Sequence, residues 1–256
     1  YMKFFCINSR PFKILACVMA LMFVMIMEVY KSTSASVYMG YAERKLPIYG
    51  VETDKKEIAI TFDAAYGSDE TVKIINILKE KNVTATFFLV GFWVDKYPDL
   101  VKTLDASGIE IGTHSNTHPY MSKLSASQMQ TELTTSVEKI KNLTGKEVTL
   151  FRPPYGDYND TLITVAENMK ITPIQWSVDS LDWKGLNTSQ MMARITPNVD
   201  NGSIILFHNN SDHIVEALPV IIDTLTEQGY KLVHVSDLIY KENYTIRNDG
   251  IQQKNK

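Results

Sequence analysis

Residues 57–90 have the sequence EIAITFDAAYGSDETVKIINILKEKNVTATFFLV, and this stretch decides the fold. It contains an apolar, β-branched run at Ile58–Phe62, a helical pattern over Glu70–Lys81 and a second strand-like run at Thr84–Val90. The apolar residues of the middle segment have the spacing of one helix face. A strand, a helix and a strand in this order form a right-handed βαβ unit, whose two strands pair in parallel.

The same alternation continues to the end of the chain. Further strands are expected at Ile109–Gly112, Val148–Phe151, Ile171–Trp176, Ser203–Phe207 and Lys231–Val235, with helices between them at Pro98–Ala106, Ser125–Leu143, Asp160–Met169, Ser189–Ile195 and Ile214–Gln228. No Gly-x-Gly-x-x-Gly follows the first strand, so a dinucleotide-binding fold is unsupported. The pattern predicts an α/β protein, a single distorted (β/α) barrel of about seven parallel strands.

The composition is that of one globular domain. The chain has 256 residues, of which 45% are hydrophobic and 21% are charged, and its net charge is −3. This charge gives no electrostatic footprint for nucleic acid. The two cysteines, Cys6 and Cys17, both lie near the N-terminus. The folded part therefore offers neither a disulfide framework nor a cysteine zinc site.

The N-terminal residues have the pattern of a targeting segment. Basic residues precede an apolar run at Ile14–Met27, and small residues follow at 32–36. We expect residues 1–31 to be a signal peptide or a signal anchor, which would place the domain outside the cytoplasm, secreted or anchored to the membrane. Residues 32–55 are expected to form a linker or leading strand, 56–241 the folded domain and 242–256 a polar tail.

Polar residues with catalytic chemistry follow the predicted strands. Asp63, His114, Arg152, Asp179 and His208 each come after the end of a strand. In β/α barrels the chemistry lies at the carboxyl ends of the strands, so these residues should converge on one active site. His114 and His118 are spaced to bind one divalent metal from one turn of chain. By itself this spacing also occurs by chance on exposed helices.

Five segments together resemble the NodB-homology polysaccharide deacetylases, or carbohydrate esterase family four. They are Thr61–Asp63, Thr113–His118, Arg152–Gly156, Asp179–Trp183 and Leu206–His208, and the resemblance covers about residues 56–241. Within the family, the chain looks most like the sporulation-associated deacetylases. The resemblance implies a hydrolase that removes N-acetyl groups from an N-acetylhexosamine polymer, above all peptidoglycan, by metal-assisted water attack. A chitin-like polymer, an O-acetylated xylan, or a non-catalytic role in binding cell-wall carbohydrate are the alternatives. We expect a monomer that binds an acetylated glycan.

The resemblance also implies the roles of individual residues. Asp63 would be the general base, although an aspartate after a strand is often only a cap. His114 and His118 would bind the metal, zinc in the first place and cobalt or nickel as alternatives. Arg152 would hold the base, while the backbone N–H of Tyr155 would stabilise the oxyanion and its ring would contact the sugar.

The leaving group would be protonated by His208. A carboxylate partner raises the pKa of a histidine, and Asp182 is the first choice for that partner, with Asp179 the second. Trp183 would offer its indole face to a sugar.

One position departs from the family pattern. Most members have a second aspartate directly after the base, which completes an Asp-His-His metal triad, and this chain has Ala64. Another oxygen ligand or water must then take that place, or metal binding is weak. Asp69 is the nearest candidate substitute, although it is more simply explained as the cap of the helix that starts at Glu70.

Overall fold

The computed structural model describes residues 19–27 and 44–255. The compact unit that carries the fold spans Lys45–Lys256, and so it begins earlier than the predicted boundary at 56. A separate unit, Tyr1–Arg44, contributes a short helix over residues 19–27. Among the described residues, no helix has the length and apolar character needed to cross a bilayer, which contradicts the expected membrane anchor. The rest of the predicted segment, including its cleavage region, lies outside the described residues.

The folded unit alternates strands and helices as the periodicity predicts. The main strands are β2 (Glu57–Ala64), β3 (Thr86–Leu89), β4 (Glu110–Thr113), β5 (Leu150–Phe151), β6 (Thr172–Pro173), β7 (Val178–Asp179), β8 (Ile204–His208) and β9 (Lys231–Leu232). The helices are α2 (Thr71–Glu80), α3 (Gly91–Lys96), α4 (Pro98–Ala106), α5 (Ala126–Thr144), α6 (Asp160–Asn168), α7 (Thr188–Ile195), α8 (Ile214–Glu227) and α9 (Val235–Leu238). The longest helix, α5, begins at a capping box formed by Ser125 and Gln128 and ends at Gly145, whose φ is 69°.

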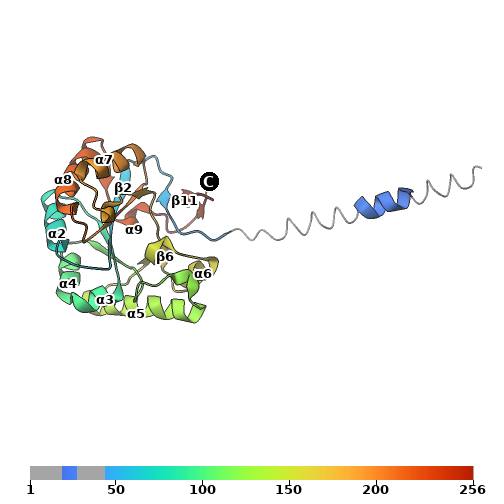
Figure 1. Cartoon of the computed structure of the whole chain (residues 1–256), viewed down its shortest axis with the longest axis horizontal. Coiled ribbons are helices and arrows are strands. Elements are labelled where there is room, and N and C mark those ends of the chain that lie inside the picture. The colour runs from blue at the N-terminus through green and yellow to red at the C-terminus, as the bar shows by residue number, and fades with distance from the viewer. Residues whose placement is uncertain (1–18, 28–43, 256) are drawn as a thin grey trace, which may run out of the picture. The chain divides into compact units, whose positions relative to one another are not determined.

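The strands form one curled parallel sheet. Its order is β6-β5-β4-β3-β2-β8-β7, with β9 paired separately to β2. Figure 1 shows α2, α4, α3 and α5 following one another along the outside of this sheet. The predicted distorted barrel of about seven parallel strands is confirmed. The predicted strand Lys231–Val235 is only the short β9, and β7 is a strand that the periodicity did not predict.

The central strand β2 separates two apolar clusters. Ile60, Phe62 and Ala64 belong to the outer cluster, which also contains the buried faces of the helices. Ala59 belongs to a smaller cluster on the opposite face. Because side chains alternate along a strand, Asp63 points to the face opposite Ala64. The register places Asp63 beside His208 of β8, so the sheet itself brings these two residues together.

The C-terminal residues are ordered into strands, contrary to the expected polar tail at 242–256. Strands β10 (Tyr244–Ile246) and β11 (Ile251–Lys254) pair antiparallel. Strand β11 also pairs in parallel with β1 (Gly50–Val51), within the predicted linker. Gln252 is fully buried, and its side chain bonds both the N–H and the carbonyl of Tyr240. This small sheet therefore fastens the end of the chain to its leading strand.

Candidate active site

A cavity of about 550 Å³ opens at the carboxyl ends of the central strands. It is lined by Asp63, Ala65, Tyr66, His114, His118, Tyr155, Trp176, Asp179, Trp183, Leu206, His208 and Asn210. The structure therefore brings together most of the residues that the sequence predicted for the site. Arg152 and Asp182 lie just behind the cavity wall, where both are fully buried.

Asp63 is held by the buried guanidinium of Arg152. The Nη1 of Arg152 donates to the Asp63 Oδ1 at 2.9 Å and to the Thr61 Oγ1 at 2.8 Å, and its Nη2 donates to the carbonyl of Gln175 at 3.0 Å. Burial alone would raise the pKa of Asp63, but the charge of Arg152 and its hydrogen bond, together with the nearby His208, hold it below its ordinary value. Asp63 is therefore ionised at neutral pH, as a general base must be.

His114 is oriented by a backbone carbonyl. Its Nδ1 lies 2.7 Å from the carbonyl oxygen of Arg152, while its Nε2 lies 3.5 Å from the Asp63 Oδ2. A carbonyl can only accept, so Nδ1 carries the proton and Nε2 keeps its lone pair. Burial lowers the pKa of His114, which keeps the ring neutral. This is the arrangement by which proteins orient a metal-binding histidine.

His118 packs close to His114, with 4.9 Å between the ring centroids. Burial and the neighbouring His114 lower the pKa of His118 to about 4, so it is also neutral. Its Nδ1 is buried and has no hydrogen-bond partner among the described residues. A buried nitrogen without a partner is costly in an apo protein, and a bound cation would remove that cost.

His208 forms a tight pair with Asp182. The His208 Nδ1 lies 2.8 Å from the Asp182 Oδ1, and the backbone N–H of His208 donates to the Asp182 Oδ2 at 2.7 Å. Burial would lower the pKa of His208, but the hydrogen bond to Asp182 and its charge outweigh burial and raise it. Asp182 is thus the partner, and Asp179, whose Oδ1 accepts from the N–H of Leu181, lies in the cavity wall.

Aromatic side chains form the walls of the cavity. Tyr155 is about half exposed, has a φ of 60°, stacks on Tyr120 with 4.3 Å between the centroids and meets the edge of His118. Trp183 is also more than half exposed. Tyr66 and Trp176 also line the cavity, but the sequence did not assign them to the site. A single aromatic residue between two strands belongs to no catalytic motif that would mark it.

The donor set fits part of a metal site. His114 and His118 offer two neutral imidazoles, and within residues 19–27 and 44–255 no group of three or more His, Cys, Asp or Glu side chains is placed to hold a metal. Ala64 is fully buried in the outer apolar cluster. Asp69 is exposed outside the cavity lining, so it does not replace the missing carboxylate. It is also not the expected helix cap, since Glu70 occupies that position without a capping side-chain bond.

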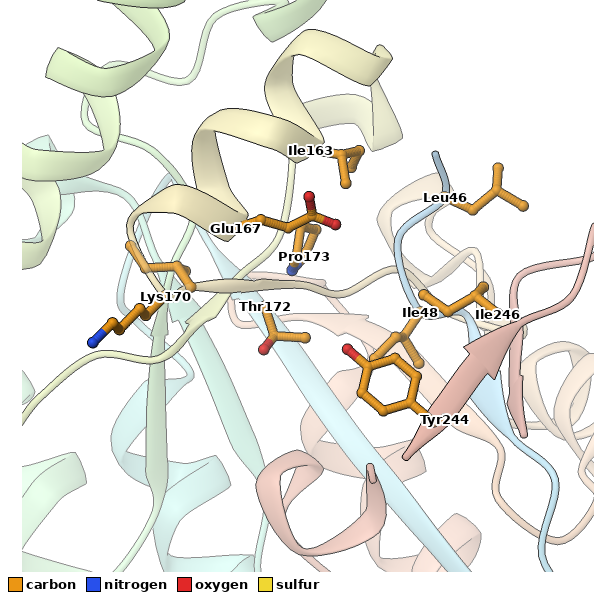
Figure 2. Close-up of a pocket in the computed structure, with 10 residues that line it drawn as sticks. Leu46, Ile48, Ile163, Glu167, Lys170, Thr172, Pro173, Tyr244 and Ile246 are labelled. Atoms are coloured by element: carbon orange, nitrogen blue, oxygen red, sulfur yellow. The ribbon is translucent and has the colours of Figure 1, made fainter. Parts of the chain in front are cut away.

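A second hollow lies far along the sheet from these residues. Figure 2 shows it between the end of α6, the start of β6 and strand β10, with Lys170 on one side and the apolar side chains of Leu46 and Ile246 on the other. None of the predicted site residues lines it. The predicted site residues therefore gather at the cavity at the carboxyl ends of the strands and not at this hollow.

Comparisons with known proteins identify relatives of this chain. Residues 50–174 match the family described as polysaccharide deacetylase. The chain is 34% identical to a peptidoglycan-N-acetylglucosamine deacetylase of Bacillus cereus, over 70% of this chain and 67% of that protein. It is 33% identical to the uncharacterized protein YlxY of Bacillus subtilis, over 82% of this chain but only 66% of YlxY.

Two solved structures share the fold with equal TM-scores. The peptidoglycan N-acetylglucosamine deacetylase Bc1960 is 31% identical with a TM-score of 0.73, over 75% of this chain and 92% of that chain. A protein of Bacillus anthracis described as a CE4 family pseudoenzyme is 34% identical with a TM-score of 0.73, over 75% of this chain and 68% of that one. The relatives, the matched domain and the shared fold establish that this chain belongs to the polysaccharide deacetylase family, whose named peptidoglycan deacetylases are hydrolases of carbon–nitrogen bonds.

Proposed function

We propose that this protein removes N-acetyl groups from an N-acetylhexosamine polymer, above all peptidoglycan, by metal-assisted attack of water. The observation that carries the proposal is that one cavity holds Asp63 bonded to the guanidinium of Arg152 and His208 bonded to the carboxylate of Asp182. Asp63 has a lowered pKa, which favours its ionised form, and His208 has a raised pKa, which favours its protonated form. Two groups tuned in opposite directions supply a base and an acid at the same pH.

Each residue then has a defined task. Asp63, fixed by Arg152, accepts the proton of the attacking water. His208 is held through Nδ1 by Asp182, which leaves Nε2 to donate a proton to the leaving amine. His114 and His118 would hold the cation, and a bound divalent metal such as zinc would polarise the acetamide carbonyl and acidify water. The backbone N–H of Tyr155 is proposed to face the developing oxyanion.

The cavity walls suit a sugar. Tyr66, Tyr155 and Trp183 are all more than half exposed and line the same opening, so their rings can cover the apolar face of a hexose ring. The named relatives support peptidoglycan as the polymer, because they are described as acting on its N-acetylglucosamine or N-acetylmuramic acid units. Comparing activity on chitin oligomers and acetylated xylan with activity on peptidoglycan tests how strictly the cavity walls discriminate between acetylated polymers.

Acetate release from peptidoglycan, chitin oligomers and acetylated xylan tests the proposal directly. The purified protein loaded with Zn²⁺ should release acetate from an N-acetylated polymer. Asp63→Asn should cut that rate by orders of magnitude, because a neutral amide cannot accept the proton. Asp99→Asn, which changes an exposed carboxylate on α4, serves as the matched control. No acetate above the Asp63→Asn background on any of the three polymers would contradict the proposal.

The second candidate function is binding of cell-wall carbohydrate without turnover. Ala64 at a usual ligand position favours it, and so does the likeness to a protein described as a pseudoenzyme. The two functions differ in a simple measurement. A binding protein would retain peptidoglycan in a pull-down and release no acetate with any divalent metal added.

A further inference from the structure

The loop that carries the two histidines has an unfavourable backbone. Ser115 has a φ of 67° and His118 a φ of 59°, in the left-handed region that non-glycine residues rarely adopt. A loop with such backbone angles keeps its conformation only where many surrounding contacts enforce it. Part of the support is internal, since the backbone N–H of His118 donates to the Ser115 Oγ at 3.0 Å.

The N–H groups of the loop are bound by one carboxylate on helix α5. The Glu132 Oε2 accepts from the backbone N–H of Asn116 at 2.9 Å and of Thr117 at 2.8 Å. The Glu132 Oε1 accepts from the Thr117 hydroxyl at 2.7 Å. Three bonds to a single ionised side chain are strong and directional, because charge-assisted bonds are shorter and stronger than neutral ones.

Two backbone carbonyl groups of the same loop are bound by the first residues of helix α3 (Gly91–Lys96). The N–H of Gly91 donates to the carbonyl of Ser115 at 2.9 Å, and the N–H of Phe92 donates to that of Asn116 at 3.2 Å. Lys139 also donates to the Asn116 Oδ1 at 2.8 Å. The first residues of helix α3 thus bind two carbonyl groups of the loop while Glu132 of α5 binds two of its N–H groups, so two helices hold the loop backbone.

We propose that Glu132 is a positioning residue for the His114–His118 loop, and that its carboxylate sets how tightly the two imidazoles bind a divalent cation. The inference rests on the proposed function through those two ligands. Glu132 sits on the outer side of the loop and does not line the cavity. It acts only by holding Asn116 and Thr117, and with them the backbone that aims His118.

Zn²⁺ titration calorimetry of the full chain tests the proposal. Glu132→Ala should weaken Zn²⁺ binding ~10–100-fold, the usual loss when the outer support of a metal ligand is removed. Glu132→Gln should restore most of the affinity, because its amide oxygen can accept both N–H groups while its NH₂ donates to Thr117. Glu138→Ala, on the same helix at an exposed position, should bind as the parent does.

A second measurement works without metal. By hydrogen–deuterium exchange, the amides of Asn116 and Thr117 should exchange faster in Glu132→Ala, while the amide of His114, bonded to the Leu89 carbonyl, stays protected. If Glu132→Ala shows no cooperative thermal transition, Thr117→Val removes the hydroxyl bond alone and should weaken Zn²⁺ binding in the same direction. Equal Zn²⁺ affinity in the parent and in the folded Glu132 or Thr117 variant overturns this inference and leaves the proposed function standing. A parent chain that binds no Zn²⁺ overturns the metal-assisted function, and this inference with it.

Discussion

Replacing Arg152 by alanine should destabilise the protein strongly near neutral pH. Arg152 has no exposed surface, and its guanidinium bonds Asp63, Thr61 and the carbonyl of Gln175. The substitution leaves the Asp63 carboxylate buried without its cation. Removing one partner of a buried ion pair typically costs ~3–5 kcal/mol, a large fraction of the stability of a domain.

The loss should depend on pH in a defined direction. In the parent, the pKa of Asp63 lies below its unfolded value, so the ionised carboxylate stabilises the fold above that value and ceases to do so as the pH falls through the folded pKa. Without Arg152, burial is left as the largest influence and raises the pKa of Asp63. The variant's deficit should therefore be greatest near neutral pH and should shrink as acidification protonates the buried carboxyl.

Urea unfolding of the metal-free proteins measures the effect. Adding Asp63→Asn to Arg152→Ala should recover part of the lost stability, because it removes the uncompensated charge. Arg247→Ala is the control, since that arginine is exposed and its loss should change stability by less than ~0.5 kcal/mol. A deficit below ~1 kcal/mol, or a double variant no more stable than Arg152→Ala, would refute the view that this buried pair is tightly coupled.

Three further predictions concern the chemistry of the site. Asp182→Asn should move the basic limb of the pH–rate profile to lower pH, because Asp182 raises the pKa of His208; an unmoved limb would assign that limb to another group. His208→Ala should slow acetate release from chitin oligomers ~10²–10⁴-fold but slow hydrolysis of an activated aryl acetate ester much less, and equal losses on both substrates would exclude the acid role. Ala64→Asp should lower the unfolding temperature without metal, since its carboxylate enters an apolar cluster, and should gain more from Zn²⁺ than the parent does; an equal gain would show that position 64 cannot reach the metal.

The fold could be predicted from the sequence where apolar residues recur with the spacing of a strand or of a helix face. The run Ile58–Phe62 and the helical faces that follow it are long enough to show their spacing, and the structure contains them with small shifts at the ends. Strand β7 spans only Val178–Asp179, which is too short for any alternation to appear. Strands β10 and β11 are polar and short, and the pairing of β11 with β1 joins residues far apart in the sequence.

The site could be predicted where a motif places a residue at the end of a strand. The choice between Asp179 and Asp182 needed the backbone, because Leu181 has a φ of 53° and turns the chain so that Asp182 reaches His208. Glu132 and Gln175 could not be found in this way. Glu132 lies within an amphipathic helix, and Gln175 binds Arg152 through its backbone carbonyl. Neither residue type shows in the sequence which group it contacts.

Ala64 connects the packing of the sheet with the chemistry of the site. Its methyl group fills the outer apolar cluster, on the face of β2 opposite Asp63, so the position contributes to stability in the metal-free protein. A carboxylate in this apolar cluster would cost stability in the metal-free protein. With alanine there, the proposed ligands that remain are two neutral imidazoles on a loop that Glu132 holds. The pairing of Asp63 with Arg152 and of His208 with Asp182 nevertheless favours the proposed acid–base role, because a protein used only for binding has no need to maintain it.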